Sequence, residues 1–403
     1  MITGYSGTDA ALSVPSELDG HTVKGIGDGA FKECDCLTAI TLPDCVIRIG
    51  DAAFFQCSLT SITLPDSLVS IGSSAFSNCS LTSITLPDSL TSIGDTAFSW
   101  CNSLTSITLP DSINTLGANP WSGCDNLTTI KVSPAHPSLA VIDGVLYSKA
   151  DKRLVCYPEV LKDETFEVPQ DVQIIGNNAF YECGSLTSIT LPDSVIRIGD
   201  WAFSRCDSLT SVTLPGRLTA IGDYTFAYCR SLTSITLPGG ITNIGDGACT
   251  GCESLTAITL PGSLAAIGDY AFAFCHSLTS VTLPDSLTSI GDGAFYICVS
   301  MSSIALPDSL SHIGDYTFAY CRSLTSVALP DSLTSIENEA FYYCENLTSV
   351  TLPDSLTSIG KQAFSNCSKD LTLTVPEGSC AEQYCISNDL EYRYTTWLDR
   401  LSD

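Results

Sequence analysis

The sequence predicts an α/β repeat solenoid built from 23-residue units, and three observations predict it. A proline returns every 23 residues from position 192 to position 376. A strand-like apolar run precedes the prolines, as in TSVTLP at 279–284, and in most units a Gly-Asp…Ala-Phe…Cys pattern follows. Leucine patterns with a fixed period of about 20 to 29 residues are typical of leucine-rich repeats. We therefore expect a right-handed leucine-rich repeat array with a parallel β-sheet face and short helical outer turns.

One unit, residues 277–299 (SLTSVTLPDSLTSIGDGAFYICV), shows which side chains belong inside. Leu278, Val281 and Leu283 have the leucine-rich spacing, and the last two share one strand face. The residues between them then face away from the core. Because one unit cannot bury its apolar residues alone, neighbouring units must stack to complete a common core.

The second half of the unit is expected to return along the outside of the array. Pro284 has no N–H and cannot extend the strand ladder. Gly291 fits a tight turn that a side chain would obstruct. Asp292 precedes Ala-Phe, where a carboxylate can cap a short helical turn. Phe295 and Cys298 are three residues apart and share the inward face of that turn.

Departures from the period predict how the chain is divided. In one irregular unit, GVLYS (144–148) and RLVCY (153–157) flank a polar turn, which predicts a β-hairpin projecting from the array. Ser379 followed by Glu382 fits a capping box, so we expect a helix over 380–388 and a last strand over 390–394. The expected divisions are an N-terminal β cap at 1–30 with paired strands at 2–5 and 11–14, repeats at 31–130 and 169–367, the irregular unit at 131–168 and a C-terminal cap at 368–403.

The composition excludes several classes of partner. The chain has 403 residues and a formal net charge of −27, which disfavours nucleic acid and anionic membrane surfaces. The N-terminus lacks a basic region followed by an apolar one, and no apolar run approaches the length of a membrane span. We expect a monomer that neither binds nucleic acid nor inserts into a membrane.

Fourteen of the twenty cysteines share one position of the unit, three residues after the aromatic slot. Shared position favours buried free thiols that pack as small apolar residues, with disulfides as the alternative. These slot cysteines are Cys34, Cys57, Cys79, Cys101, Cys124, Cys183, Cys206, Cys229, Cys252, Cys275, Cys298, Cys321, Cys344 and Cys367. The other six, which are the candidates for bridging, are Cys36, Cys45, Cys156, Cys249, Cys380 and Cys385.

No catalytic constellation emerges from the motifs. The sequence has no G-x-S-x-G, H-E-x-x-H or Walker pattern. Cys249 and Cys252 have C-x-x-C spacing, but Cys249 fills the aromatic slot, which favours a core substitution over a redox or zinc site. Two aspartate columns, one after the proline and one before Ala-Phe, stack like charges about 5 Å apart. Calcium would relieve their repulsion, but turn and cap roles explain both columns. We expect no enzyme, no cofactor and no metal site.

The repeated pattern LxxIxLPxxLxxIGxxAFxxC resembles the BspA-type, or Treponema-type, leucine-rich repeat over roughly residues 21–367. The segments DGVLYSKADKRLVCYP (143–158) and PEGSCAEQYC (376–385) also resemble segments common in that family. The resemblance implies a surface or secreted protein of host-associated bacteria or parasitic protists, often an adhesin for host proteins. We therefore expect an extracellular or cell-surface location.

Two surfaces are candidates for binding. Aromatic residues collect on the outer turns of the second half, and tyrosine-rich exposed tracts suit contact with protein or glycan. These residues are Trp201, Tyr224, Tyr228, Tyr270, Phe274, Tyr296, Tyr316, Tyr320, Tyr342 and Tyr343. The rival is the outward strand face, with Ser188/Thr190, Ser211/Thr213, Ser234/Thr236, Ala257/Thr259 and Ser280/Thr282. The leading hypothesis is a non-catalytic protein that adheres to a host or neighbouring-cell protein or glycan. The alternative is a structural, glycan-binding or ice-binding β scaffold without a specific protein partner.

Overall fold

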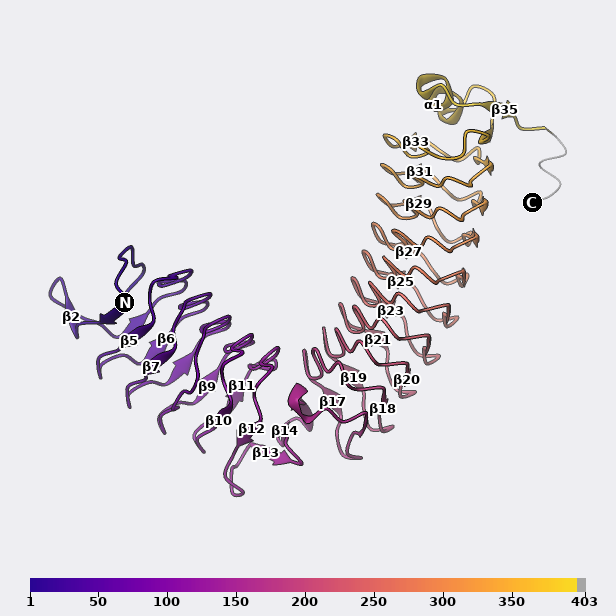
Figure 1. Cartoon of the computed structure of the whole chain (residues 1–403). Helices are drawn as coiled ribbons and strands as arrows, with labels where there is room; N and C mark the ends of the chain where they lie inside the picture. Colours follow the sequence, from indigo (N-terminus) through magenta and orange to yellow (C-terminus); the bar gives the residue numbers. More distant parts are fainter. Residues whose placement is uncertain (397–403) are drawn as a thin grey trace. The chain divides into compact units, whose positions relative to one another are not determined.

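The computed structural model describes residues 1–396, which form two compact units of stacked coils. Unit 1 comprises Met1–Asp163 with Asp171–Gly184, and unit 2 comprises Glu164–Gln170 with the chain from Ser185 onward. Most coils add a three-residue strand to one parallel sheet and a two-residue strand to a second (Figure 1). The chain is therefore a parallel-strand β-solenoid with a repeat of about 23 residues, as the period predicts. Its handedness stays a prediction.

Unit 1 holds the N-terminal coils and the irregular unit. Its three-residue strands are β1 (Ala11–Ser13), β5 (Ala39–Thr41), β7 (Ser61–Thr63), β10 (Ser106–Thr108) and β12 (Thr129–Lys131). Its two-residue strands in the coils are β4 (Gly25–Ile26), β6 (Arg48–Ile49), β8 (Ser70–Ile71), β9 (Ser92–Ile93), β11 (Thr115–Leu116) and β17 (Ile174–Ile175). Antiparallel pairing occurs between β2 (Glu17–Leu18) and β3 (His21–Thr22), and among β13 (Leu139–Ile142), β14 (Val145–Ser148) and β15 (Arg153–Cys156).

Unit 2 is the more regular of the two. Its first long sheet contains β16 (Thr165–Glu167), β18 (Ser188–Thr190), β20 (Ser211–Thr213), β22 (Ser234–Thr236), β24 (Ala257–Thr259) and β26 (Ser280–Thr282). Its second contains β28 (Ser303–Ala305), β30 (Ser326–Ala328), β32 (Ser349–Thr351), β34 (Thr372–Val375) and β35 (Tyr392–Tyr394). The two-residue strands are β19 (Arg197–Ile198), β21 (Ala220–Ile221), β23 (Asn243–Ile244), β25 (Ala266–Ile267), β27 (Ser289–Ile290), β29 (His312–Ile313), β31 (Ser335–Ile336) and β33 (Ser358–Ile359).

Two predictions about local pairing need correction. The segments 2–5 and 11–14 do not pair with each other, because Ile2 bridges Ile26 and β1 pairs with β5, so each segment extends a column of the array. The predicted hairpin of β14 and β15 does form. It does not project, because all of β14 is buried and β15 pairs in parallel with β17. Its apolar side chains therefore join the core of unit 1.

The C-terminal helix forms where the capping box predicts it. Helix α1 is Cys380–Asn388, and the Ser379 side chain accepts a hydrogen bond from the Glu382 N–H at 3.2 Å. The Glu382 carboxylate accepts from the Gly378 N–H at 2.6 Å. Strand β35 then pairs in parallel with β34, as a last strand. The final seven residues of the predicted cap, 397–403, lie outside the described part of the chain.

The prediction of short helical outer turns is wrong. Residues 1–396 contain one α-helix, α1, and one 3-10 helix, η1 (Glu159–Leu161), and neither belongs to a repeat turn. In the outer turns alternate backbone N–H groups bond to the next coil, as Tyr270 N does to the Asp292 carbonyl at 2.8 Å, while others bond within their own turn, as Ala273 N does to the Tyr270 carbonyl at 3.1 Å. Neighbouring coils are therefore joined by hydrogen bonds at the outer turns as well as along the two sheets.

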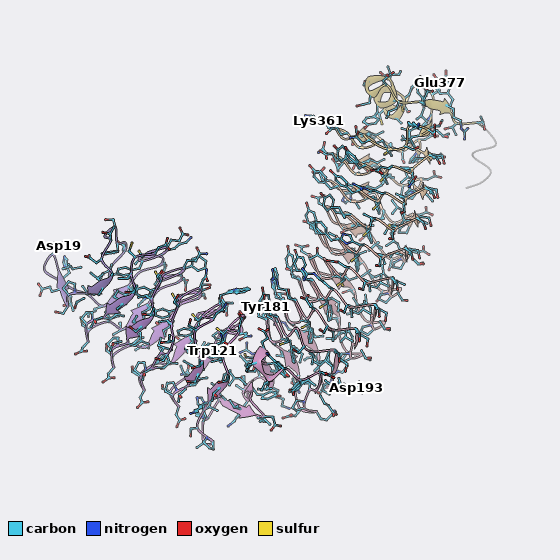
Figure 2. The ribbon with its side chains drawn as sticks, viewed as in Figure 1. Asp19, Trp121, Tyr181, Asp193, Lys361 and Glu377 are labelled. Atoms are coloured by element: carbon cyan, nitrogen blue, oxygen red, sulfur yellow. The ribbon has the colours of Figure 1, made fainter. Side chains whose placement is uncertain are left out.

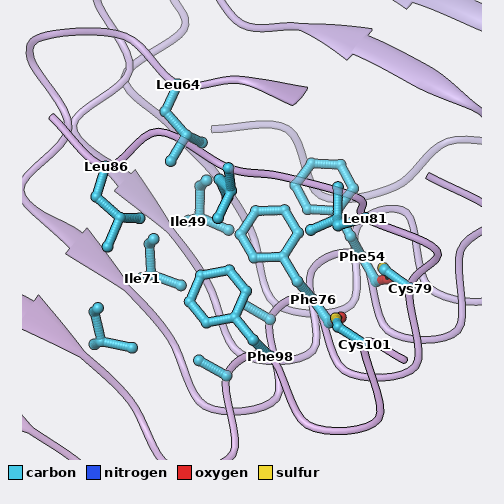
Figure 3. Close-up of a cluster of buried hydrophobic side chains, with 14 of the residues drawn as sticks. Ile49, Phe54, Leu64, Ile71, Phe76, Cys79, Leu81, Leu86, Phe98 and Cys101 are labelled. Carbon is cyan, nitrogen blue, oxygen red and sulfur yellow. Dashed lines mark hydrogen bonds between the residues drawn. The ribbon is translucent and has the colours of Figure 1, made fainter. Parts of the chain in front are cut away.

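The core is a column of phenylalanine rings with thiols beside it. In Figure 3 Phe54, Phe76 and Phe98 lie one above another, with centroids 5.2 and 5.3 Å apart. In unit 2 the column is interrupted where Cys249, also buried, takes the ring position, as predicted. Twelve of the fourteen slot cysteines are buried, and all twenty cysteines are free. Each thiol can also donate a hydrogen bond, as Cys298 Sγ does to the Phe272 carbonyl at 3.2 Å. Because these thiols are buried away from water, their pKa is raised, as at Cys298.

The glycine and aspartate found in most units set the spacing between coils. A Cβ on Gly291 would lie 2.5 Å from the Asp269 N and 2.6 Å from the Gly268 carbonyl carbon in the preceding coil. The Asp292 carboxylate, predicted to cap a helical turn, instead accepts the N–H of Asp315 in the next coil at 2.8 Å. At Gly291 the coils approach this closely because the residue has no side chain, so the Gly-Asp pair is a coil-to-coil contact.

Candidate binding surface

Two positions of every regular outer turn in unit 2 have a left-handed backbone. The first follows the aspartate, as Tyr270 does with φ 53°, and the second precedes the slot cysteine, as Phe274 does with φ 59°. We call them the first turn position (201, 224, 247, 270, 293, 316, 339 and 362) and the second turn position (205, 228, 251, 274, 297, 320, 343 and 366). A left-handed backbone costs a residue with a side chain about 1–2 kcal/mol relative to glycine.

Aromatic residues occupy many of these positions although glycine also serves there. Gly247 and Gly293 hold the first turn position and Gly251 the second, with φ between 56° and 70°. Unit 1 fills most of the equivalent positions with small or polar residues, among them Ala52 and Asn78, although Trp100 holds one of them. The coil therefore does not require a ring at either position.

The glycines also leave space for the tyrosine rings of the preceding coil. A Cβ on Gly251 would come within 2.6 Å of the Tyr228 ring, and one on Gly293 within 2.6 Å of the Tyr270 ring. A Cβ on Gly247 would likewise collide with the Tyr224 ring. Each tyrosine thus lies against the bare backbone of the following coil. Sequence reasoning missed this relation, although the signal was present as glycine alternating with tyrosine at one position of the repeat.

Seven of the ten predicted residues form one connected group, which we call the aromatic surface: Tyr270, Phe274, Tyr296, Tyr316, Tyr320, Tyr342 and Tyr343. Tyr296 is central, with edge-to-face contacts to Phe274 at 5.5 Å and Tyr320 at 5.7 Å between centroids. Tyr343 stacks on Tyr320 at 5.1 Å. Such contacts hold the rings in fixed orientations.

The accessible part of the aromatic surface is centred on one coil. Tyr270 is 40% exposed and Phe274 is 37% exposed, and the other five rings are half-buried. Exposed aromatic side chains gathered in one place are typical of interaction sites.

The other three predicted residues lie apart from this group. Trp201 and Tyr224 stack at 4.2 Å with an interplanar angle of 14°. The Arg205 guanidinium lies 5.7 Å from the centroid of the Tyr228 ring. Within the described residues no ring contact links these two groups to the aromatic surface.

Carboxylates border the aromatic surface in three of its four coils, and Asn338 takes the same position in the fourth. Asp246, Asp269, Asp292 and Asp315 form one column, in which each Oδ1 accepts the N–H of the next coil at 2.8 Å. Burial, followed by the charges of Asp292, Asp269 and Asp315, raises the pKa of Tyr270. Lys361 occupies the same position in the last coil and marks this edge of unit 2 in Figure 2.

The rival strand face is also present, with its hydroxyls aligned. Ser188, Ser211 and Ser234 lie in register on neighbouring strands of one sheet, as do Thr190, Thr213 and Thr236. These side chains are nearly identical from coil to coil, whereas the outer turns vary.

An acidic cluster in unit 1 was not predicted. One carboxylate oxygen each from Asp125, Glu159 and Glu182 lies within 4.8 Å of the others. Burial, together with the charges of Asp125 and Glu182, raises the pKa of Glu159 to about 7. These three residues come from segments far apart in the sequence, so no local motif could predict the cluster.

Comparison with known proteins identifies the family to which the repeat belongs. The family model described as "BspA type Leucine rich repeat region (6 copies)" matches residues 24–146, 156–277 and 242–371. The chain belongs to the BspA-type leucine-rich repeat family. The resemblance predicted from the sequence is therefore confirmed.

Solved structures share the solenoid of this BspA-type protein. A leucine-rich repeat protein from Eubacterium ventriosum is 24% identical, with TM-score 0.57, over 89% of this chain and 83% of that one. A leucine rich cell surface protein from Faecalibacterium prausnitzii is 31% identical, with TM-score 0.52, over 69% of this chain and 89% of that one. A search of curated proteins found no match. In the described part of the chain, no helix is both long and apolar enough to cross a bilayer.

Proposed function

We propose that this chain is a non-catalytic surface or secreted protein that binds a host or neighbouring-cell macromolecule through the outer turns of unit 2. The observation that carries the proposal is the choice of Tyr224, Tyr270 and Tyr316 at left-handed positions where Gly247 and Gly293 also serve. Residues held in costly backbone conformations cluster at functional sites. A ring that the coil does not need, at a conformational cost, is most simply explained by binding.

The scaffold supports the same proposal. Repeat arrays present extended surfaces on which many weak contacts add up. Specificity requires variation, and the outer turns vary more between coils than the strand face does. The similar protein from Faecalibacterium prausnitzii is described as a cell surface protein, which favours a surface or extracellular location for this chain. We further propose that the chain acts as a monomer and binds neither nucleic acid nor membrane.

The test compares wild type with a variant that loses rings but keeps the backbone. Tyr224→Gly, Tyr270→Gly and Tyr316→Gly introduce the residue that Gly247 and Gly293 already show to fit. The matched control changes Ser188, Ser211, Ser234 and Ser280 to alanine on the strand face. Both variants are screened against host matrix proteins and a glycan array. We expect the ring variant to lose the captured ligand and the strand variant to keep it.

The opposite result would assign binding to the strand face and support the alternative of a β scaffold that binds glycan. Ice binding belongs to the same alternative, because aligned threonines are the feature it would use. Measurable thermal hysteresis that survives loss of the rings would favour it over our proposal.

A further inference from the structure

We propose that the aromatic surface binds an extended lysine- or arginine-rich segment of a partner protein. This inference rests on the proposed function and names the chemistry of the partner. Three features support it: the distribution of charge around the rings, the hydrogen bonds of the neighbouring carboxylates, and a cation that lies on one ring of the same array.

The charge around the aromatic surface is one-sided. Residues 231–343 contain one lysine or arginine, Arg322, which pairs with Glu345 at 3.5 Å, but they contain ten acidic residues: Asp246, Glu253, Asp269, Asp285, Asp292, Asp308, Asp315, Asp331, Glu337 and Glu339. Four of them form the column that borders the rings. In the next coil Glu339 lies within 3.4 Å of the Tyr316 hydroxyl. A cationic partner would therefore meet rings and carboxylates together.

In the carboxylates of Asp269 and Asp292, one oxygen holds the next coil and the other is available to accept a hydrogen bond from a partner. Asp269 Oδ1 accepts the N–H of Asp292, and Asp292 Oδ1 accepts that of Asp315. Oδ2 of these two residues accepts no hydrogen bond from any described residue, and both side chains are exposed. Successive coils are about 4.8 Å apart, so these charges reinforce one another well within the screening length of about 8 Å at physiological salt.

The array already contains the contact that we propose. Arg205, at the second turn position of its coil, lies with its guanidinium 5.7 Å from the Tyr228 ring of the next coil. Among the described residues no lysine or arginine lies over any ring of the aromatic surface. A guanidinium or ammonium group over a tyrosine face is favourable, and more so when water is excluded. The partner would supply to Tyr270, Phe274 and Tyr320 what Arg205 supplies to Tyr228.

The same observations disfavour other occupants. A second copy of this chain also carries a net charge of −27 and would be repelled. A neutral glycan could stack on the rings but would gain nothing from the carboxylates. The aromatic surface covers four coils, or about 15 Å, which an extended segment of about four or five residues would span.

The experiment uses the full chain and labelled peptides of equal length, with Lys/Arg-Gly, Gln-Gly or Glu-Gly repeats, in fluorescence anisotropy at physiological salt. One variant removes rings: Tyr270→Gly, Phe274→Gly and Tyr316→Gly. A second removes nearby charge: Asp269→Asn, Asp292→Asn and Asp315→Asn. Asparagine keeps the coil contact, because Asn338 Oδ1 accepts the Lys361 N–H at 3.0 Å in the same column.

A third variant is the matched charge control. It carries Asp285→Asn, Asp308→Asn and Asp331→Asn in the column that follows the prolines, so the net charge changes equally. The two columns lie at opposite edges of unit 2: in Figure 2 Lys361 marks the column beside the rings and Asp193 the column after the prolines. Only the site-specific proposal predicts different effects for the two charge variants.

Of the three peptides, we expect only the one with Lys/Arg-Gly repeats to bind the wild-type protein. The ring variant and the nearby-charge variant should each weaken it about tenfold, which corresponds to about 1.4 kcal/mol, and the control less than twofold. Equal weakening by both charge variants, or unchanged binding by the ring variant, would overturn the inference. If matrix proteins or glycans bind in a ring-dependent way while the basic peptide does not bind, this inference fails and the proposed function stands. If no binding depends on the rings, both fail.

Discussion

The three tyrosines at the first turn position allow the cost of the turn backbone to be measured separately from the rings. Tyr224, Tyr270 and Tyr316 have φ of 52°, 53° and 57°. Changing all three to alanine or all three to glycine removes the same rings. The two variants then differ only in how well the residue tolerates a left-handed backbone.

The expected difference follows from the backbone. Alanine costs about 1–2 kcal/mol in this conformation relative to glycine. Against this, glycine lowers the free energy of unfolding by about 0.4–1 kcal/mol because the unfolded chain has more conformational freedom with glycine than with alanine. The net preference is about 1 kcal/mol per site. The sites are two coils apart, about 10 Å, so their effects should add to about 3 kcal/mol in favour of glycine.

The assay is urea unfolding followed by circular dichroism, with Ser211, Ser234 and Ser280 as the control positions. These serines lie in β20, β22 and β26, where glycine should be less stable than alanine by about 0.5–1 kcal/mol each. The preferred residue should therefore reverse between turn and strand. If alanine is at least as stable as glycine at the turn positions, the reasoning that the rings are costly there is refuted.

Three further predictions concern the core, the coil spacing and the acidic cluster. A thiol reagent should label Cys298 only after denaturant is added, because burial raises its pKa; mass spectrometry showing disulfide-linked slot cysteines would contradict this. Gly268→Ala should lower the unfolding free energy by about 2–3 kcal/mol, since its Cβ would lie 2.7 Å from the Asp246 N, whereas Gly262→Ala, with no atom within 4 Å, should be neutral in the same melt. The raised pKa of Glu159, about 7 against 4.5, means that the folded state holds its proton more tightly, so stability should fall as the pH rises from 4.5 to 7. Glu159→Gln should then stabilise the protein by about 1 kcal/mol at alkaline pH, after allowance for solvent screening, and not at acid pH; an equal gain at both pH values would rule out the protonation argument.

The period alone was enough to predict the coils. Val281 and Leu283 alternate with Ser280 and Thr282, and in the structure Val281 and Leu283 are buried while Ser280 and Thr282 are exposed. This succeeds because side-chain direction along a strand depends only on the residue count. The thiol positions follow for the same reason, since one slot repeats in every coil.

The turn geometry could not be predicted in this way. A pair such as Tyr270 and Phe274 has helical spacing, but its N–H groups bond to Asp292 and Tyr296 of the next coil. That choice depends on how close the next coil lies, and Gly291 sets the distance. The candidate aromatic residues were thus chosen correctly as outer-turn residues for the wrong backbone reason. Their contacts, which pass through Tyr296 between two other coils, could be seen only once the coils were stacked.

The central claim is that the rings of unit 2 bind and are not needed for folding. Its most direct test is the affinity of the Tyr224→Gly, Tyr270→Gly, Tyr316→Gly variant, measured beside wild type, for the ligand that wild type captures in the host-protein and glycan screen. We expect a variant that still folds cooperatively and whose affinity falls about tenfold or more. Undiminished affinity in a variant that unfolds cooperatively would contradict it.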